Sequence, residues 1–177
     1  MKKRQESRAE KDLRMIASVL SGGVGEHHLR MLAQALGQAL DADMAWIGQL
    51  VGSEGDRLQT VGLYLHGKIV DNATYEVANM PCADVLEKEI SVYRSGVRER
   101  FPLVPRLAQL HAESYAGMSL VDSLGRVLGM IGVVSSRRIH DEERVTTLLR
   151  IFGARAALEL ERGLMDEQTF RQVTAAL

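Results

Sequence analysis

The chain of 177 residues contains 46% hydrophobic and 25% charged residues and has a formal net charge of −1. This balance is typical of one globular domain with a sizeable core, and it argues against a disordered chain. The sequence pI of about 6.5 gives no general attraction to nucleic acid or to acidic membranes. We therefore expect neither of them as a partner.

The cysteine content and the N-terminal segment restrict the cellular setting. The single cysteine, Cys82, excludes an intrachain disulfide and leaves no cysteine cluster for zinc. The apolar run from Met15 to Leu20 is too short for a signal peptide or a membrane span. These features predict a cytoplasmic protein and no membrane contact from this segment.

Residues 1–24 are expected to form an N-terminal amphipathic helix followed by a glycine-rich hinge. Leu13, Ile16 and Leu20 have the spacing of one helical face within residues 8–20. The stretch from Ser21 to Gly25 then interrupts helical propensity. A phosphate-binding loop is the alternative, but it needs a preceding strand and a following lysine, and this stretch has neither.

A second helix is predicted over residues 26–40, followed by two strands, Met44–Val51 and Leu58–Leu65, in a hairpin. Both strands carry apolar residues on both faces, which predicts helices on one side of the sheet and loops or an enclosed pocket on the other. Residues 66–111 contain only short elements, and we expect them to form a loop-rich lid. These are strands at 73–77 and 90–93 and helices at 82–88 and 106–111.

The stretch from Ser114 to Val134 is predicted to form two apolar strands joined by a tight turn at residues 122–125. Tyr115, Gly117 and Ser119 share one face of the first strand, because side chains alternate along a strand. We expect this face to line a pocket and the opposite face to pack against helices.

A long helix is predicted to begin after Asp141, which is placed to cap it. Its apolar spacing continues past the domain into an extension over residues 163–177. Because both terminal helices carry an apolar stripe, we expect them to pack together and against a second copy, giving a homodimer.

The ordered set of segments HLRMLAQALGQALDAD, MAWIGQL, NMPCADVLEKE and SYAGMSLVDSLGRVLGMIGVV resembles the GAF family over residues 25–162. This resemblance implies an α+β, PAS-like fold. Its central antiparallel sheet of about six strands has the N- and C-terminal helices on one face and a lid of loops and short helices over a pocket on the other. Members of the family bind cyclic nucleotides, bilins, haem or small metabolites, and some only dimerise.

The residues do not support the more specific chemistry of this family. Bilin-binding members attach their chromophore through a cysteine that is usually followed by histidine, whereas Cys82 precedes Ala83. Thiol exchange would need a second cysteine. His140 and the three acidic residues after it point in different directions on a helix, so capping is favoured over metal binding. We expect no catalytic residue, no metal and no evident cofactor.

The function predicted from the sequence is that of a sensory module, not an enzyme. It would bind an unknown small molecule and signal through its dimer helices to an effector domain in the same polypeptide. The alternative is a ligand-free dimerisation module in which the aromatic rings only fill the core. The candidate pocket residues are Trp46, Tyr64, Tyr75, Cys82, Tyr93, Phe101, Tyr115, Gly117 and Ser119.

Overall fold

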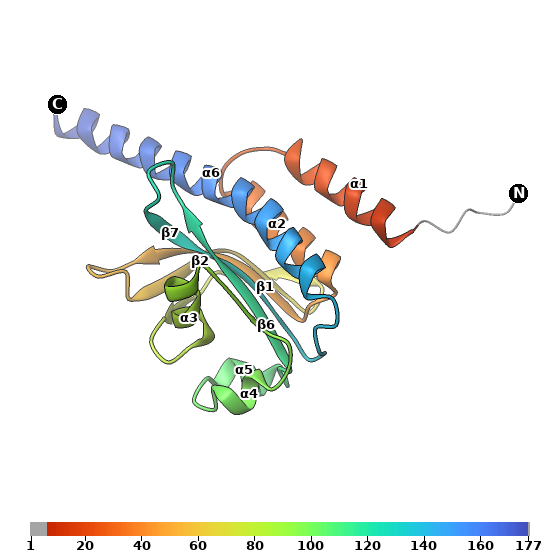
Figure 1. Cartoon of the computed structure of the whole chain (residues 1–177). Helices are drawn as coiled ribbons and strands as arrows, with labels where there is room; N and C mark the ends of the chain where they lie inside the picture. Colours follow the sequence, from red (N-terminus) through yellow and green to blue (C-terminus); the bar gives the residue numbers. More distant parts are fainter. Residues whose placement is uncertain (1–6, 177) are drawn as a thin grey trace, which may run out of the picture.

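An antiparallel sheet of seven strands separates two groups of helices in the computed structural model, which describes residues 7–176 (Figure 1). The strands are β1 (Met44–Val51), β2 (Arg57–Leu65), β3 (Lys68–Val70), β4 (Thr74–Glu76), β5 (Ile90–Tyr93), β6 (Ser114–Val121) and β7 (Val127–Ser135). Their order is β3-β2-β1-β7-β6-β5, and β4 also pairs with β2. The α+β fold expected from the sequence is confirmed. Strand β3 had not been expected, because its three residues are too few to show an alternating pattern.

The helices are divided between the two faces of this sheet. The helix-side face carries α2 (Glu26–Leu40) and α6 (Glu142–Ala175), and α1 (Arg8–Leu20) packs on these two helices. The lid-side face carries the short helices α3 (Pro81–Lys88), α4 (Val97–Arg100) and α5 (Pro105–Gln109). Helix α4 had not been expected. The arrangement of terminal helices on one face and a lid on the other agrees with the prediction.

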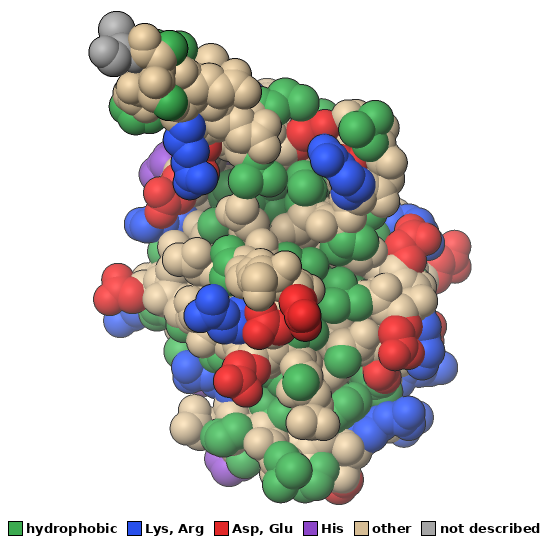
Figure 2. Space-filling view, turned by 90° about the vertical axis from the view of Figure 1, so that its left-hand side faces the viewer, with side chains coloured by type: hydrophobic (Ala, Val, Ile, Leu, Met, Phe, Trp, Pro, Cys, Tyr) green, Lys and Arg blue, Asp and Glu red, His purple; other side chains and the backbone are tan. Residues whose placement is uncertain are grey.

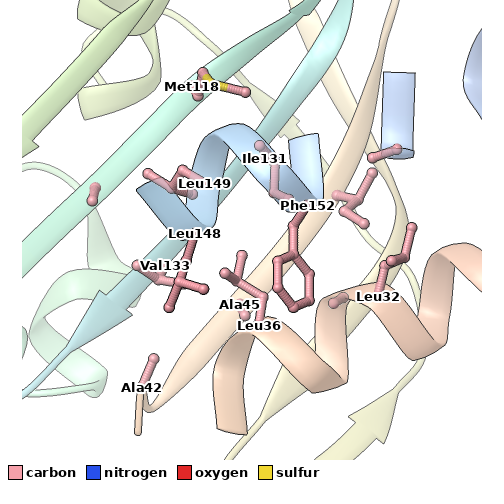
Figure 3. Close-up of a cluster of buried hydrophobic side chains, with 14 of the residues drawn as sticks. Leu32, Leu36, Ala42, Ala45, Met118, Ile131, Val133, Leu148, Leu149 and Phe152 are labelled. Carbon is pink, nitrogen blue, oxygen red and sulfur yellow. The ribbon is translucent and has the colours of Figure 1, made fainter. Parts of the chain in front are cut away.

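The helix-side face contains a densely packed apolar core. Phe152 of α6 lies between α2 and the sheet, close to Leu32 and Leu36 (Figure 3), and all three are fully buried. Helix α2 comes very close to β2, because a Cβ atom on Gly62 would lie 2.6 Å from the backbone oxygen of Leu29. No side chain larger than hydrogen can occupy that position without moving the helix.

Buried polar contacts fasten the three helices to one another. The Arg144 guanidinium of α6 donates two hydrogen bonds of 2.8 Å to Asp12 of α1 and a third of 2.8 Å to the Ala39 carbonyl at the end of α2. Glu159 of α6 is buried and accepts a hydrogen bond of 2.8 Å from the backbone N–H of Gly25, at the start of α2. Helix α1 is therefore seated on the domain, as the sequence predicted for the two terminal helices.

The turn between β6 and β7 is built around Asp122. Its carboxylate accepts hydrogen bonds from the backbone N–H groups of Leu124 (2.9 Å) and Arg126 (2.8 Å) and from the Arg126 guanidinium (2.7 Å). Burial alone would raise the pKa of Asp122, but these bonds outweigh it and hold the pKa below its ordinary value. Gly125 supplies the positive φ of 80° that closes the turn.

Helix α6 begins at the predicted cap, where the Asp141 side chain accepts a hydrogen bond from the backbone N–H of Arg144. Its C-terminal part projects beyond the sheet, and Figures 1 and 2 show that end standing clear of the rest of the molecule. None of the helices within residues 7–176 combines the length and apolar character that a membrane crossing requires. The first six residues of the expected 1–24 segment and the last residue of the 163–177 extension lie outside the described residues.

Candidate functional site

A small cavity lies between the sheet and the lid. Its volume is about 40 Å³, counted as the space open to the centres of water molecules. Strand β1 contributes Trp46, β4 contributes Tyr75, α3 contributes Cys82 and β6 contributes Tyr115. These four predicted site residues, which are distant in sequence, are therefore brought together around one cavity.

Tyr115 is the central ring of this site and is almost fully buried. Its ring lies 5.7 Å from that of Trp46, centroid to centroid, and its hydroxyl donates a hydrogen bond of 3.4 Å to the sulfur of Cys82. Burial raises the pKa of the Cys82 thiol and raises that of the Tyr115 hydroxyl well above its ordinary value. Both groups stay protonated at neutral pH, so Cys82 is a poor nucleophile here.

Two residues that line the cavity carry a buried polar atom with no hydrogen-bond partner in the part of the chain that the structure describes. These atoms are the indole nitrogen of Trp46 and the hydroxyl oxygen of Tyr75. A buried donor without a partner costs about 1–3 kcal/mol, so most such groups in folded proteins are satisfied. Both wall residues therefore have unused hydrogen-bonding capacity, although the surface of the cavity itself is apolar.

Tyr93 and Phe101 lie beside the cavity and are not part of its wall. Their rings meet edge to face at 5.4 Å, and the Tyr93 hydroxyl donates a hydrogen bond to Asp84 of α3. The Arg100 guanidinium lies 5.1 Å from the centre of the Tyr93 ring. These contacts hold the lid against β5.

The prediction that Tyr64 lines the pocket is wrong, because its side chain points to the helix side and packs over Gly37 of α2. The cause is a β-bulge in β2, where Ile47 pairs with Gly62 and Gly48 pairs with Thr60, leaving Val61 as an extra residue. A one-residue insertion reverses the faces of all later side chains.

Gly117 and Ser119 face the lid side but do not line the cavity. A Cβ atom on Gly117 would lie 2.6 Å from the Tyr115 hydroxyl, so the space beside this glycine is already filled by the ring. The Ser119 hydroxyl donates a hydrogen bond of 3.3 Å to the carbonyl of Glu89. Gly117 therefore supports the position of the Tyr115 ring, and Ser119 ties β6 to the end of α3.

Several wall residues were not predicted from the sequence. Met44 could have been found, because it alternates with Trp46 on β1, but the residues from α5 and its approach could not, since lid loops have no periodic pattern. No group of three His, Cys, Asp or Glu side chains within residues 7–176 is arranged to hold a metal ion. The further wall residues are Met44, Leu58, Glu76, Val77, Met80, Pro81, Val104, Arg106, Leu107 and Val134.

Solved structures with a similar fold include several phytochromes or their domains. A bacteriophytochrome from R. palustris aligns with 97% of this chain at 12% identity and a TM-score of 0.66, and this chain spans 42% of its length. The phycoerythrobilin-bound GAF domain of a cyanobacterial phytochrome aligns with 93% of this chain and 100% of that domain, at 11% identity and a TM-score of 0.65.

A similar structure also comes from a protein of another type. The GAF domain of an Acinetobacter phosphoenolpyruvate-protein phosphotransferase aligns with 93% of this chain and 99% of that domain, at 14% identity and a TM-score of 0.70. No curated protein matches the sequence. The family model of the GAF domain matches residues 26–160. This match covers most of the sequence and the complete sheet, and the chain belongs to the GAF domain family.

Proposed function

We propose that this chain is a sensory GAF module that binds a small molecule in the lid-side cavity and transmits the bound state through its terminal helices. The observation that carries this proposal is an enclosed cavity with an apolar surface, beside which the Trp46 indole N–H and the Tyr75 hydroxyl are buried without a hydrogen-bond partner among residues 7–176. A ligand with an apolar body and hydrogen-bond acceptors at its edge would satisfy both donors.

The size of the cavity sets how such a ligand would enter. About 40 Å³ is room for water-sized groups, whereas ligand pockets are typically several hundred Å³. Binding therefore requires the lid to move away from the sheet. Helices α3, α4 and α5 contain 8, 4 and 5 residues, and such short elements separate from a sheet at lower cost than long helices do.

The family and its similar structures support a regulatory role without naming the ligand. GAF domains are generally sensory or regulatory rather than catalytic. Two of the similar structures come from phytochromes, and one of these domains holds a bilin. Identities of 11–12% transfer the fold alone, and Cys82 lacks the histidine that follows the attachment cysteine in bilin-binding members.

Transmission would use helix α6, which runs across the helix-side core and projects beyond it. Large apolar side chains remain exposed on the terminal helices, including Leu13 of α1 and Leu158 and Phe170 of α6. A second copy of the chain would cover them in a homodimer. A ligand that prefers one arrangement of the paired helices would then shift their populations and change the state of an effector domain in the same polypeptide.

A second candidate function is a ligand-free dimerisation module. The small cavity favours it, because a core that is nearly filled has little to gain from a ligand. The two functions make the same prediction for the dimer and opposite predictions for the cavity.

Native mass spectrometry of freshly purified protein separates these two functions, because it measures the oligomer and any retained small molecule together. We expect a dimer with one added mass per chain, lost in Tyr75→Phe, which removes one of the two unpartnered donors. Tyr64→Phe is the matched control, because Tyr64 lies on the opposite face of the sheet, and it should retain the added mass. An empty dimer in all three proteins would support the ligand-free module.

A further inference from the structure

A second hollow lies at the end of the molecule where α1 and α6 begin and α2 ends. Its volume is about 410 Å³, and its wall includes four arginines and one histidine against two aspartates, Asp41 and Asp141. We call it the basic cleft and define it by Arg8, Arg137, Arg138, His140 and Arg144. Because the whole chain has a net charge of −1, this concentration of positive charge is local.

Two of the arginines form no close ion pair among the described residues. The side chains of Arg8 and Arg138 are exposed, and neither forms a hydrogen bond or an ion pair with any residue between 7 and 176. They come from segments about 130 positions apart in sequence, one at the start of α1 and one in the loop between β7 and α6. The fold brings to the same hollow two guanidinium groups that have no ion-pair partner within residues 7–176.

The other two arginines differ in how firmly they are held. Arg137 forms an ion pair of 2.5 Å with the Asp41 carboxylate and also donates a hydrogen bond to the Asp41 backbone carbonyl. The two side chains are 60% and 78% exposed, so another anion can compete with the carboxylate while the bond to the carbonyl is kept. The hydrogen bond from Arg137, with a smaller contribution from Arg8, holds the pKa of Asp41 below its ordinary value. Arg144 is largely buried and remains bound to Asp12. The Asp41 carboxylate is therefore an exchangeable partner of Arg137, whereas Arg144 is a fixed part of the wall.

The loop that carries Arg137 and Arg138 is held in place from both sides. The Ser114 hydroxyl donates a hydrogen bond of 2.6 Å to the Arg137 carbonyl, and the backbone N–H of Ser136 donates one of 2.5 Å to Asp43. Further along the loop, the backbone N–H of Ile139 donates a hydrogen bond of 3.0 Å to the carbonyl of Arg94. Binding to this loop would therefore cost little conformational entropy, because the loop is already ordered.

We propose that the basic cleft binds a small polyvalent oxyanion of the phosphate ester or pyrophosphate class, held by Arg8 and Arg138 and joined by Arg137. The planar guanidinium group matches the spacing of phosphate oxygens and can donate two parallel hydrogen bonds to them. Several guanidinium groups around one hollow favour an anion with more than one charge. The carboxylate of Asp141 caps α6 and repels any anion nearby, but the four arginines of the wall outnumber its two aspartates.

Such an anion would link helix α1 to the loop that leads into α6. Arg8 belongs to α1, whereas Arg137 and Arg138 precede α6 directly, so one bound anion would fix the start of both helices. No residue of the basic cleft lines the lid-side cavity. The cleft is thus a separate site, and an anion bound there would act on the terminal helices without passing through the lid.

Isothermal titration calorimetry of the full chain with inorganic pyrophosphate, at constant ionic strength, tests this proposal. We expect saturable binding at about one anion per chain, weakened about tenfold in both Arg8→Ala and Arg138→Ala, because each change removes a charge-assisted hydrogen-bond donor. Arg150→Ala is the matched control. Arg150 lies elsewhere on α6, and its side chain is likewise exposed and pairs with Glu89 at the end of α3. The Arg150→Ala variant should bind like the parent protein.

Three results would overturn the proposal: no saturable heat, unchanged binding in Arg8→Ala and Arg138→Ala, or equal weakening in Arg150→Ala, which would indicate general charge attraction. Circular dichroism of each variant checks that the fold is intact, which we expect because the substituted side chains are exposed. Tyr75→Phe should bind pyrophosphate normally. The experiments therefore test the lid-side proposal and the basic-cleft proposal independently.

Discussion

The two faces of the sheet are both apolar, but they are covered in different ways. On the helix side, α2 and α6 contain 15 and 34 residues, and their side chains fill the interface with fully buried groups such as Leu32 and Phe152. On the lid side, three helices of at most eight residues leave a cavity between themselves and the sheet.

The buried polar groups without a hydrogen-bond partner are also unevenly divided between the two faces of the sheet. The three buried side-chain atoms without a hydrogen-bond partner in residues 7–176 belong to Trp46, Tyr75 and Ser91. Trp46 and Tyr75 line the cavity, and Ser91 alternates with Ile90 and Val92, which pack toward the helices. All three therefore lie on the lid side. The comparison indicates that the helix side is a scaffold, and that the lid side is the face that can gain stability from a ligand.

The largest effect should come from Phe152→Ala, which removes a fully buried ring from the helix-side core. We expect the free energy of unfolding to fall by about 3–5 kcal/mol, measured by chemical denaturation, because the transfer energy of the ring is lost and a cavity remains. Phe170→Ala on the same helix is the control, since Phe170 is 70% exposed, and it should change stability by less than about 0.5 kcal/mol in the monomeric protein. A small loss in Phe152→Ala would show that the helix side is not the scaffold.

A smaller loss is expected from Gly62→Ala, which tests whether α2 and β2 are in backbone contact. The added methyl group would meet backbone atoms of Leu29 and Arg30, which cannot rotate away, so unfolding should become easier by about 1–3 kcal/mol. Gly163→Ala is the opposite control on α6, where nothing lies within 4 Å, and it should stabilise the helix by up to about 1 kcal/mol. The two glycine-to-alanine substitutions should therefore change the melting temperature in opposite directions in thermal denaturation.

The long helices and the last two strands of the fold were more predictable than the site. The spacing of apolar residues located α1, α2 and α6, and the alternation in Ser114–Val134 placed Tyr115 on the lid side, because both patterns are periodic and local. Asp122 and Gly125 marked the turn between β6 and β7 through their own side-chain and backbone preferences.

The site was only partly predictable, because its shape depends on non-local features. The bulge at Val61 sends Tyr64 to the helix side, and a bulge is defined by the partner strand, not by the sequence of β2 alone. The proximity of Tyr115 to Cys82 depends on how α3 folds over the sheet. The basic cleft likewise forms only because α1 lies beside the loop that precedes α6. None of these has a periodic pattern that a single sequence could show.

The smallest expected effect concerns the pH dependence of the lid side. Burial raises the pKa of Tyr115 well above its ordinary value of 10.0, so the folded state keeps a proton that the unfolded state releases. A raised folded-state pKa stabilises the protein below the unfolded value, and this stabilisation is lost as the pH rises toward the folded value. Between pH 10 and 11 the free energy of unfolding should therefore fall by about 1 kcal/mol more in the parent protein than in Tyr115→Phe.

Tyr115→Phe removes both the titrating hydroxyl and its hydrogen bond to Cys82. The slopes of stability against pH in the two proteins distinguish these two effects. Loss of that bond shifts the whole curve of stability against pH, whereas loss of the titrating hydroxyl changes only its slope above about pH 10. Between pH 7 and 8 the two proteins should have parallel curves, because the Cys82 thiol and the Tyr115 hydroxyl remain protonated in both states. Parallel curves above pH 10 as well would mean that water reaches Tyr115, and that the lid is already open in the absence of a ligand.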